Sequence, residues 1–190
     1  MKITLYFGSF NPIHNGHLAV ARKVMEEKLS DELWLVVSPQ NPLKEEETLW
    51  PEEDRLAMVE LAIENEEGMI ASDYEFRLPR PSYTYQTLRR LKQQFPQHTF
   101  RLLIGGDNLE AFDHWRDHQS IIDEFGLIVY PRPGYQNEAL VHHPNVTLLN
   151  APLLDISSTE IRERLASGKS LSPLVPKQVE NYIKTKGYWQ

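Results

Sequence analysis

The sequence predicts an α/β fold: a doubly wound parallel sheet with helices on both faces. Short apolar runs alternate along the chain with segments in which apolar residues recur every three or four positions, the spacings typical of strands and helices. Strands that are joined through helices run parallel and are covered on both faces. Residues 157–190 carry helical signals with no strand between them. We therefore expect a single domain over residues 1–190 that ends in a small helical extension.

Six apolar runs predict the strands, and the third of them is the weakest signal. They are Ile3–Phe7, Leu33–Val37, Met69–Ala71, Phe100–Ile104, Leu127–Tyr130 and Val146–Leu149. In a Rossmann-like sheet of this kind, ligands bind beyond the carboxyl ends of the strands. Gly8, Ser38 and Gly105 each follow a predicted strand, so we expect them to converge on one cleft.

Helical periodicity fills most of the connections between these strands. Leu18, Ala21 and Val24 share one face of a first helix. Pro51 suits the first turn of a second helix, whose expected apolar face is Leu56, Val59, Ala62 and Ile63. Residues 84–95 predict a third helix, and the stretch 131–144, rich in Pro, Gly, His and Asn, predicts a surface loop.

The composition excludes several classes of protein. The chain has 190 residues, a formal net charge of −7 and no cysteine, which excludes disulfides and thiolate metal sites and suits a reducing compartment. No run approaches the ~20 apolar residues of a membrane span. The acidic balance argues against nonspecific binding to nucleic acid. We expect a cytoplasmic protein whose positive potential is concentrated at the histidines of the first loop, Lys44, Arg132 and Arg162.

Residues 8–17, Gly-Ser-Phe-Asn-Pro-Ile-His-Asn-Gly-His, are the most informative segment. They connect the first predicted strand to the first helix, where unpaired N–H groups and the positive end of the helix dipole bind phosphate. His14 and His17, three positions apart, can both face such a site. A phosphate site with two imidazole donors is suited to phosphoryl chemistry. A glycine turn with two capping histidines is the plainer alternative.

A second phosphate motif lies at residues 156–162, Ile-Ser-Ser-Thr-Glu-Ile-Arg. Ser157 and Glu160 match a capping box, and Gly168 suits the end of the helix. An ordinary capped helix would explain the serine and the glutamate. The three consecutive hydroxyl residues can also bind phosphate oxygens, and Arg162 can approach the same oxygens with its two-pronged guanidinium.

The two motifs together resemble the signatures G-x-F-x-P-x-H-x-G-H and I-S-S-T-x-I-R of the nucleotidylyltransferases. Three further segments, 38–44, 81–88 and 104–115, are similar to those of the bacterial nicotinate mononucleotide adenylyltransferase family, and the resemblance runs over residues 1–182. It implies adenylyl transfer from ATP to nicotinate mononucleotide, which yields nicotinate adenine dinucleotide and pyrophosphate in NAD biosynthesis. Two positions depart from the family: Gly106 replaces the usual Ala, and Arg116 stands where an aromatic residue is common.

The resemblance also implies roles for individual residues. His14, His17, Lys44 and Arg162 are expected to be catalytic. Asp107 is expected to accept hydrogen bonds from the adenosine ribose, although a helix N-cap is its plainer role. The residues expected to bind ATP are Gly8, Ser9, Phe10, Gly16, His17, Gly105, Asp107, Ile156, Ser157, Ser158 and Arg162.

Four residues are expected to bind nicotinate mononucleotide: Asn11, Lys44, Thr84 and Trp115. Trp115 would stack on the pyridine ring, with a plain core tryptophan as the alternative. Thr84 and nearby backbone N–H groups would bind the ring carboxylate. His114 and His118 have a spacing that can bind metal, but solvated histidines are the usual case, and we expect no metal site built by the protein.

The expected reaction needs no covalent intermediate and no general base, because a phosphate monoester with a second pKa of about 6 is already largely ionised at neutral pH. The enzyme must position two anions in line and stabilise the charge that grows on pyrophosphate. Mg²⁺ is expected to arrive bound to ATP. The alternatives are a nicotinamide mononucleotide or phosphopantetheine adenylyltransferase and a catalytically silent nucleotide-binding domain. The sequence leaves open whether the chain is a monomer or a homo-oligomer.

Overall fold

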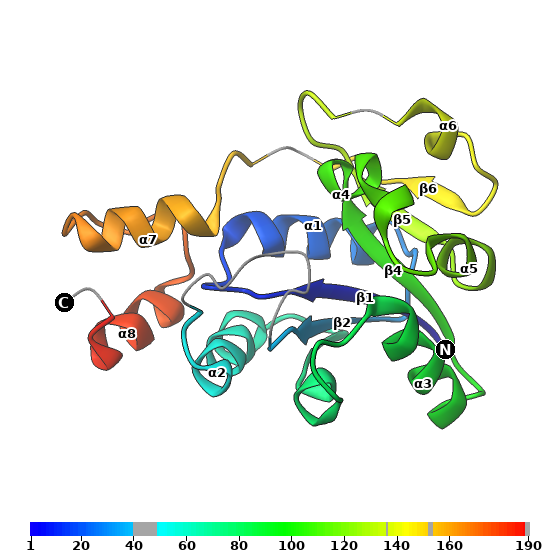
Figure 1. The fold of residues 1–190 in the computed structure, drawn as a ribbon. Coiled ribbons are helices and arrows are strands. Elements are labelled where there is room, and N and C mark those ends of the chain that lie inside the picture. Colours follow the sequence, from blue (N-terminus) through cyan, green and yellow to red (C-terminus); the bar gives the residue numbers. More distant parts are fainter. Residues whose placement is uncertain (40–48, 136, 152–153, 189–190) are drawn as a thin grey trace.

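The computed structural model describes residues 1–39, 49–135, 137–151 and 154–188. Within these residues, six strands form one parallel sheet in the order β3-β2-β1-β4-β5-β6 (Figure 1). The order reverses between β1 and β4, so the sheet is doubly wound and the predicted fold class is confirmed. The strands are β1 (Lys2–Gly8), β2 (Glu32–Val37), β3 (Met69–Ser72), β4 (Thr99–Gly105), β5 (Leu127–Tyr130) and β6 (Val146–Leu148).

Helices connect the strands and extend beyond the last one. Before β4 lie α1 (Asn15–Glu26), α2 (Glu52–Ile63), the 3-10 helix η1 (Tyr74–Arg77) and α3 (Thr84–Gln94). After β4 come α4 (Gly106–Glu110), η2 (Phe112–His114), α5 (His118–Glu124), α6 (Glu138–Val141), α7 (Ser158–Ala166) and α8 (Lys177–Lys186). The short α6 lies inside the stretch 131–144, which was expected to be loop throughout.

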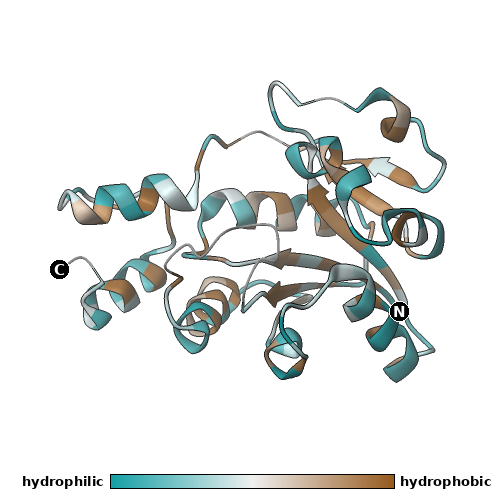
Figure 2. Ribbon diagram, viewed as in Figure 1, coloured by the Kyte–Doolittle hydropathy of each residue, from teal (hydrophilic) through white to brown (hydrophobic). Residues whose placement is uncertain are grey.

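Alternation along each strand produces a core on each face of the sheet. In β4, Leu103 joins the core with α1 and α2, whereas its neighbours Leu102 and Ile104 join the core with α3 and α5, as the two-residue period of a strand requires. In Figure 2 the strands are mostly hydrophobic in colour and the helices show both colours. This pattern is typical of a buried parallel sheet covered by amphipathic helices.

The C-terminal helices belong to the same core as α1. Ile161 of α7 and Val179 and Ile183 of α8 are fully buried in the cluster that contains Ala21 and Val24. Figure 1 places α7 and α8 together at the end of the molecule toward which β1 runs. The predicted extension therefore closes one side of the region beyond the carboxyl end of β1.

The buried face of α2 is wider than the predicted one. The structure buries Arg55, Met58, Val59, Ala62 and Ile63, and leaves Leu56 only partly buried. Leu56 packs against the same core, so the predicted face is confirmed, but the prediction omitted Met58 and the charged Arg55. An arginine at a core-facing position carries no hydrophobic signal, so apolar periodicity alone could not detect it.

Candidate active site

A cleft of about 300 Å³ lies beyond the carboxyl ends of β1 and β4. It collects residues from both predicted phosphate motifs and from the segments after β4 and before α3. Thirteen predicted site residues line it: Gly8, Ser9, Phe10, His14, His17, Thr84, Gly105, Asp107, Trp115, Ile156, Ser157, Ser158 and Arg162. Gly8 and Gly105 thus converge where the strand order reverses, as a doubly wound sheet predicts. Ser38, which was expected to join them, does not line the cleft; its carbonyl accepts Nη1 of Arg55.

His14 and His17 cap the first helix with their own rings. His14 is the N-cap of α1, and its Nδ1 accepts the backbone N–H groups of Gly16 (3.0 Å) and His17 (3.3 Å). In return, Nδ1 of His17 accepts the backbone N–H of His14 at 3.1 Å. The two rings stack with centroids 3.6 Å apart. This reciprocal capping box is built from imidazoles in place of Ser and Glu.

The capping contacts fix which nitrogen of each ring carries the proton. An Nδ1 that accepts a hydrogen bond from a backbone N–H has no proton of its own, so the neutral ring is protonated at Nε2. Both rings therefore offer an Nε2–H donor, and both line the cleft. The capping role and the phosphate-binding role, which the sequence posed as alternatives, are compatible because they use different nitrogens.

Both histidines are neutral in the free protein at pH 7. Burial and the nearby Arg132 lower the pKa of His14 to about 4. Burial, His14 and Arg132 lower the pKa of His17 well below its usual value. The expectation that these histidines concentrate positive charge was therefore wrong, because a desolvated imidazole beside a guanidinium loses its proton. They contribute directional hydrogen-bond donors.

Two glycines let rings lie against the backbone of this loop. A Cβ on Gly16 would lie 2.8 Å from Cε1 of His14, and a Cβ on Gly8 would lie 3.0 Å from the ring of Phe10. Phe10 itself has a φ of +47°, a left-handed conformation that is uncommon for a residue with a side chain. Gly16 thus makes room for the capping ring of His14, which explains why glycine stands between the two histidines.

The segments after β4 and β5 supply an acidic and a basic side chain, Asp107 and Arg132. Asp107 lies in the first turn of α4, whose N-cap is Gly105, so the alternative of an Asp107 N-cap was wrong. Its Oδ1 is buried and has no hydrogen-bond partner among the described residues, and Nε of Arg132 lies 3.7 Å away. A buried carboxylate oxygen without a hydrogen bond is an available acceptor for a ligand hydroxyl.

The second motif begins α7 on the opposite side of the cleft. Oγ of Ser157 caps the helix by accepting the N–H of Glu160 at 3.1 Å. The Glu160 carboxylate pairs with Arg164 at 3.2 Å, so only the serine half of the predicted capping box is confirmed. Ser158 donates to the carbonyl of Pro12 at 2.9 Å, which ties the two motifs together.

Arg162 also bridges the two motifs. Its Nη1 donates to the carbonyl of Asn11 at 2.8 Å, and its Nη2 donates to Oγ1 of Thr159 at 3.2 Å. Asn11 is buried, and its Oδ1 accepts the backbone N–H of Trp50 at 3.1 Å. Asn11 thus holds the first loop in place, and it does not line the cleft.

The residues expected at the nicotinate end lie at one side of the cleft. Thr84 begins α3, and Trp115 is half-buried and packs on Phe112 at 5.5 Å between ring centroids. Trp115 is therefore neither a plain core residue nor fully exposed. Lys44 lies outside the described residues. His114 is exposed, and the described part of the chain contains no group of three or more metal-ligating side chains.

A second hollow of about 530 Å³ adjoins the cleft. The two share Tyr6, His14, His17, Tyr130, Arg132 and Ile156. Beyond this common wall, the second hollow is lined by Gly16 and by mostly apolar side chains, among them Val20, Ala151 and Leu154. The histidine pair therefore stands between a polar compartment and a more apolar one.

Tyr6 and Tyr130 line both compartments, and no sequence motif indicated them. Burial and Tyr130 raise the pKa of Tyr6, so its hydroxyl stays protonated. Arg55, a buried residue that contacts the first loop, was likewise not predicted. The only available signal for Arg55 was its position on the face of α2 that also carries Met58, Val59 and Ala62.

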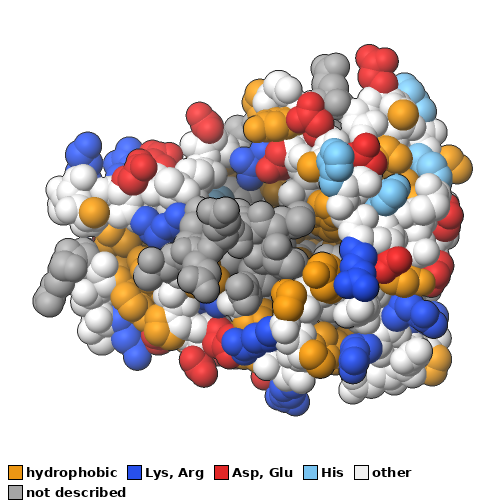
Figure 3. All heavy atoms as spheres, in the orientation of Figure 1, with side chains coloured by type: hydrophobic (Ala, Val, Ile, Leu, Met, Phe, Trp, Pro, Cys, Tyr) orange, Lys and Arg blue, Asp and Glu red, His pale blue; other side chains and the backbone are white. Residues whose placement is uncertain are grey.

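On the face shown in Figure 3, basic and acidic side chains are interspersed, and neither positive nor negative charge dominates among the described residues that are visible.

Among the described residues, no helix has the length and hydrophobicity to cross a membrane.

The chain is similar to known proteins over most of its length. The family model described as cytidylyltransferase-like matches residues 5–164. Proteins named "Probable nicotinate-nucleotide adenylyltransferase" from Cytophaga hutchinsonii and Bacteroides fragilis are 49% and 48% identical to the chain. The alignments cover 100% and 94% of this chain and 98% and 90% of the relatives. The chain belongs to this nicotinate-nucleotide adenylyltransferase group of the cytidylyltransferase-like family.

Solved structures confirm the fold independently. The structure titled "Plasmodium falciparum nicotinic acid mononucleotide adenylyltransferase complexed with NaAD" is similar with a TM-score of 0.85 at 24% identity. The similarity covers 99% of this chain and 97% of that one. The C-terminal helices therefore belong to the shared fold.

Proposed function

We propose that the chain transfers the adenylyl group of ATP to nicotinate mononucleotide, with release of pyrophosphate. The observation that carries this proposal is the meeting of three phosphate-binding elements in one cleft. These are the Nε2–H donors of His14 and His17, the N-terminus of α7 at Ser157, and the guanidinium of Arg162. Relatives that share close to half of the sequence carry the name of this activity.

In this proposal, each part of the substrates would occupy one of the two compartments. The shared wall at the histidines would hold the α-phosphate, and the more apolar hollow beyond it has room for a purine. Gly105 and the unpartnered Oδ1 of Asp107 would hold the adenosine ribose. Thr84 and Trp115, on the side of the cleft away from the apolar hollow, would hold the pyridine ring and its carboxylate.

The reaction would be a single in-line displacement at the α-phosphorus. An oxygen of the mononucleotide phosphate forms the new P–O bond, while the bond to the bridging oxygen breaks and pyrophosphate leaves with the electron pair. The attacking phosphate is already ionised, so no residue needs to accept a proton. The histidines would donate to the α-phosphate oxygens, and Arg162 would stabilise the negative charge that develops on pyrophosphate. Lys44, which lies outside the described residues, is proposed to add a second cation.

Mg²⁺ would enter as part of the substrate Mg-ATP. Its ligands would be phosphate oxygens and water, since Mg²⁺ keeps several waters and uses few protein carboxylates. The protein's own contribution is positioning and charge.

The decisive experiment measures pyrophosphate release from Mg-ATP with three acceptors side by side: nicotinate mononucleotide, nicotinamide mononucleotide and phosphopantetheine. We expect the nicotinate substrate to be preferred strongly. Preference for the amide would move the activity to a close relative, and no release with any acceptor would favour a silent nucleotide-binding domain. Thr84→Ala and Trp115→Ala should then reduce the preference for the acid over the amide if these residues bind the ring.

A further inference from the structure

Arg55 is a buried cation directly beneath the first phosphate-binding loop. It begins the buried face of α2 and is only 1% exposed. Nε donates to the carbonyl of Trp50 at 2.9 Å, and Nη1 donates to the carbonyls of Ser9 at 2.6 Å and Ser38 at 2.7 Å. Nη2 reaches the carbonyl of Pro39 at 3.4 Å. One side chain thus joins three segments: the loop after β1, the residues that follow β2 and the segment that precedes α2.

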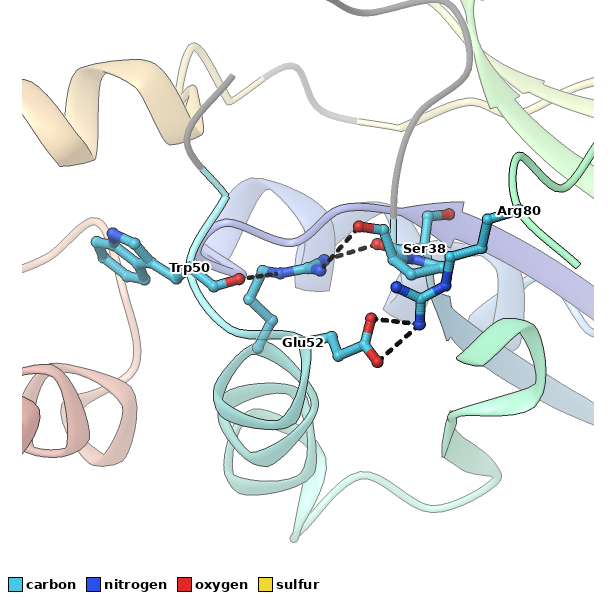
Figure 4. A network of polar contacts seen from close by, with 6 residues as sticks. Ser38, Trp50, Glu52 and Arg80 are labelled. Carbon is cyan, nitrogen blue, oxygen red and sulfur yellow. Dashed lines mark hydrogen bonds and ion pairs between the residues drawn. The ribbon is translucent and has the colours of Figure 1, made fainter. Parts of the chain in front are cut away.

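The guanidinium of Arg55 donates its hydrogen bonds to backbone carbonyls. Figure 4 shows the carbonyls of Trp50 and Ser38 converging on one guanidinium, while Glu52 faces Arg80. That carboxylate accepts two hydrogen bonds from Arg80, at 2.8 and 2.9 Å. Burial lowers the pKa of Arg55, but a guanidinium keeps its charge inside proteins. A buried charge is tolerated only when its donors are satisfied, so the carbonyls must stay turned toward it.

The direction of the Ser9 carbonyl also fixes the direction of the next N–H group, which belongs to a residue that lines the cleft. The peptide unit that joins Ser9 and Phe10 is planar and trans, so its N–H points opposite to its carbonyl. Because the Ser9 carbonyl is directed at Arg55, the N–H of Phe10 is directed away from Arg55. Ser9 and Phe10 both line the cleft. Phe10 has a positive φ of +47°, a conformation that is uncommon for a residue with a side chain, and the bond from Arg55 fixes the carbonyl of the peptide unit that precedes it.

The loop is fixed from its other side as well. The carbonyl of Asn11 accepts Nη1 of Arg162 at 2.8 Å, and its side chain accepts the N–H of Trp50 at 3.1 Å. Trp50 is itself bound to Arg55. Loss of Arg55 would therefore release the Ser9 carbonyl and remove the bond that holds the carbonyl of Trp50.

We propose that Arg55 is a positioning residue for adenylyl transfer. It does not line the cleft; it acts by turning the Ser9–Phe10 peptide so that the N–H of Phe10 is presented to a phosphate of the bound substrate. This inference rests on the proposed function, since the effect appears in phosphate binding and turnover. A displacement of about 1 Å in a reacting group can lower the rate by about 100-fold, which sets the size of the expected effect.

The test compares Arg55→Ala and Arg55→Lys with Met58→Ala. Met58 is fully buried on the same face of α2, one turn further along, and its truncation leaves a cavity that destabilises the fold without removing a hydrogen bond to the loop. We expect Arg55→Ala to lose about 100-fold in kcat and to bind Mg-ATP about tenfold more weakly by calorimetry. Arg55→Lys keeps the positive charge but lacks the planar guanidinium that reaches several carbonyls at once, and it should lose about tenfold in kcat. Met58→Ala should keep kcat within about twofold.

Chemical rescue separates positioning from stability. Millimolar guanidinium chloride should raise the turnover of Arg55→Ala by filling the vacated site, and it should not raise that of Met58→Ala. Equal losses in the Arg55 and Met58 variants after correction for the folded fraction would overturn the proposal, and so would an unchanged kcat in Arg55→Ala. If the wild type releases no pyrophosphate with any acceptor, the proposed function has failed. Mg-ATP affinity then decides: tenfold weaker binding in Arg55→Ala supports the positioning role, and equal binding overturns it.

Discussion

The two helix N-termini at the cleft are capped by different chemistry. At α1 the cap is His14, only 3% exposed, and its ring and that of His17 accept the backbone N–H groups. At α7 the cap is the hydroxyl of Ser157, and the first turn contains Glu160. Figure 1 shows the two helix ends beside each other, and the bond from Ser158 to Pro12 confirms their proximity.

The difference indicates that the two helix N-termini contribute differently: α1 supplies directional hydrogen-bond donors, and α7 supplies positive charge. The buried imidazoles at α1 are neutral and have a fixed tautomer, so they act as rigid hydrogen-bond donors. The more open end of α7 carries Arg162, whose charge is permanent. Neutral donors in a desolvated site are strong but short-ranged, whereas a guanidinium also attracts anions from a distance. A site that must bring two anions together benefits from both.

The largest expected effect tests the α1 side. His17→Ala should lower kcat by about 10²–10³-fold with little change in KM, because a donor aimed at developing charge acts mainly in the transition state. Steady-state kinetics with Mg-ATP and the preferred mononucleotide measure this. His114→Ala, which alters an exposed histidine outside the cleft, is the matched control and should be unchanged. An unaltered kcat with a raised KM would contradict the role given to His17.

The next effect concerns pH and the neutral state of His14. Its pKa is about 4 in the folded protein and about 6.5 when unfolded, so the unfolded chain binds more protons between these values. Stability is therefore fully present above pH 6.5 and is lost as the pH falls toward 4, by about 3 kcal/mol for this group. Urea unfolding at pH 7.5, 6 and 4.5 measures the loss.

His14→Asn isolates that contribution. Asparagine is a good N-cap, so the helix start is kept while the titrating group is removed. The variant should have a flatter profile of unfolding free energy between pH 6.5 and 4 than the wild type. His17, whose pKa is also lowered, should leave part of the slope. Identical slopes in wild type and variant would show that His14 does not titrate as described.

The position of the cleft could be predicted because the sequence patterns that determine it, apolar periodicity and two short motifs, are local. The six strands, the two phosphate motifs and their meeting at the sheet edge all follow from apolar periodicity and from Gly8, Gly16 and Ser157. The charge state of His14 did not follow, because it depends on burial and on Arg132, which lies more than a hundred residues away in the sequence.

Arg55 illustrates a second limit. Its partners are carbonyls from three segments, and a carbonyl is present at every residue, so no sequence pattern indicates this contact. Asp107 illustrates a third limit, since a single acidic residue after a strand suits an N-cap and a first-turn position equally. The structure places Asp107 in the first turn of α4, after the N-cap Gly105.

The smallest expected effect tests the α7 side. Ser157→Ala removes the hydroxyl that accepts the N–H of Glu160 and should lower the free energy of unfolding by about 1 kcal/mol, and Ser157→Gly by only a few tenths. Turnover should fall by less than about tenfold in both variants, because the backbone N–H groups of α7 and Arg162 remain in place. Thermal unfolding and steady-state kinetics, measured on the same preparations, give both values. If kcat fell as far in Ser157→Ala as in His17→Ala, the hydroxyl would contribute to the chemistry as directly as the imidazoles. The directional hydrogen bonds to the substrate would then come from both helix N-termini, and the contrast between α1 and α7 would be wrong.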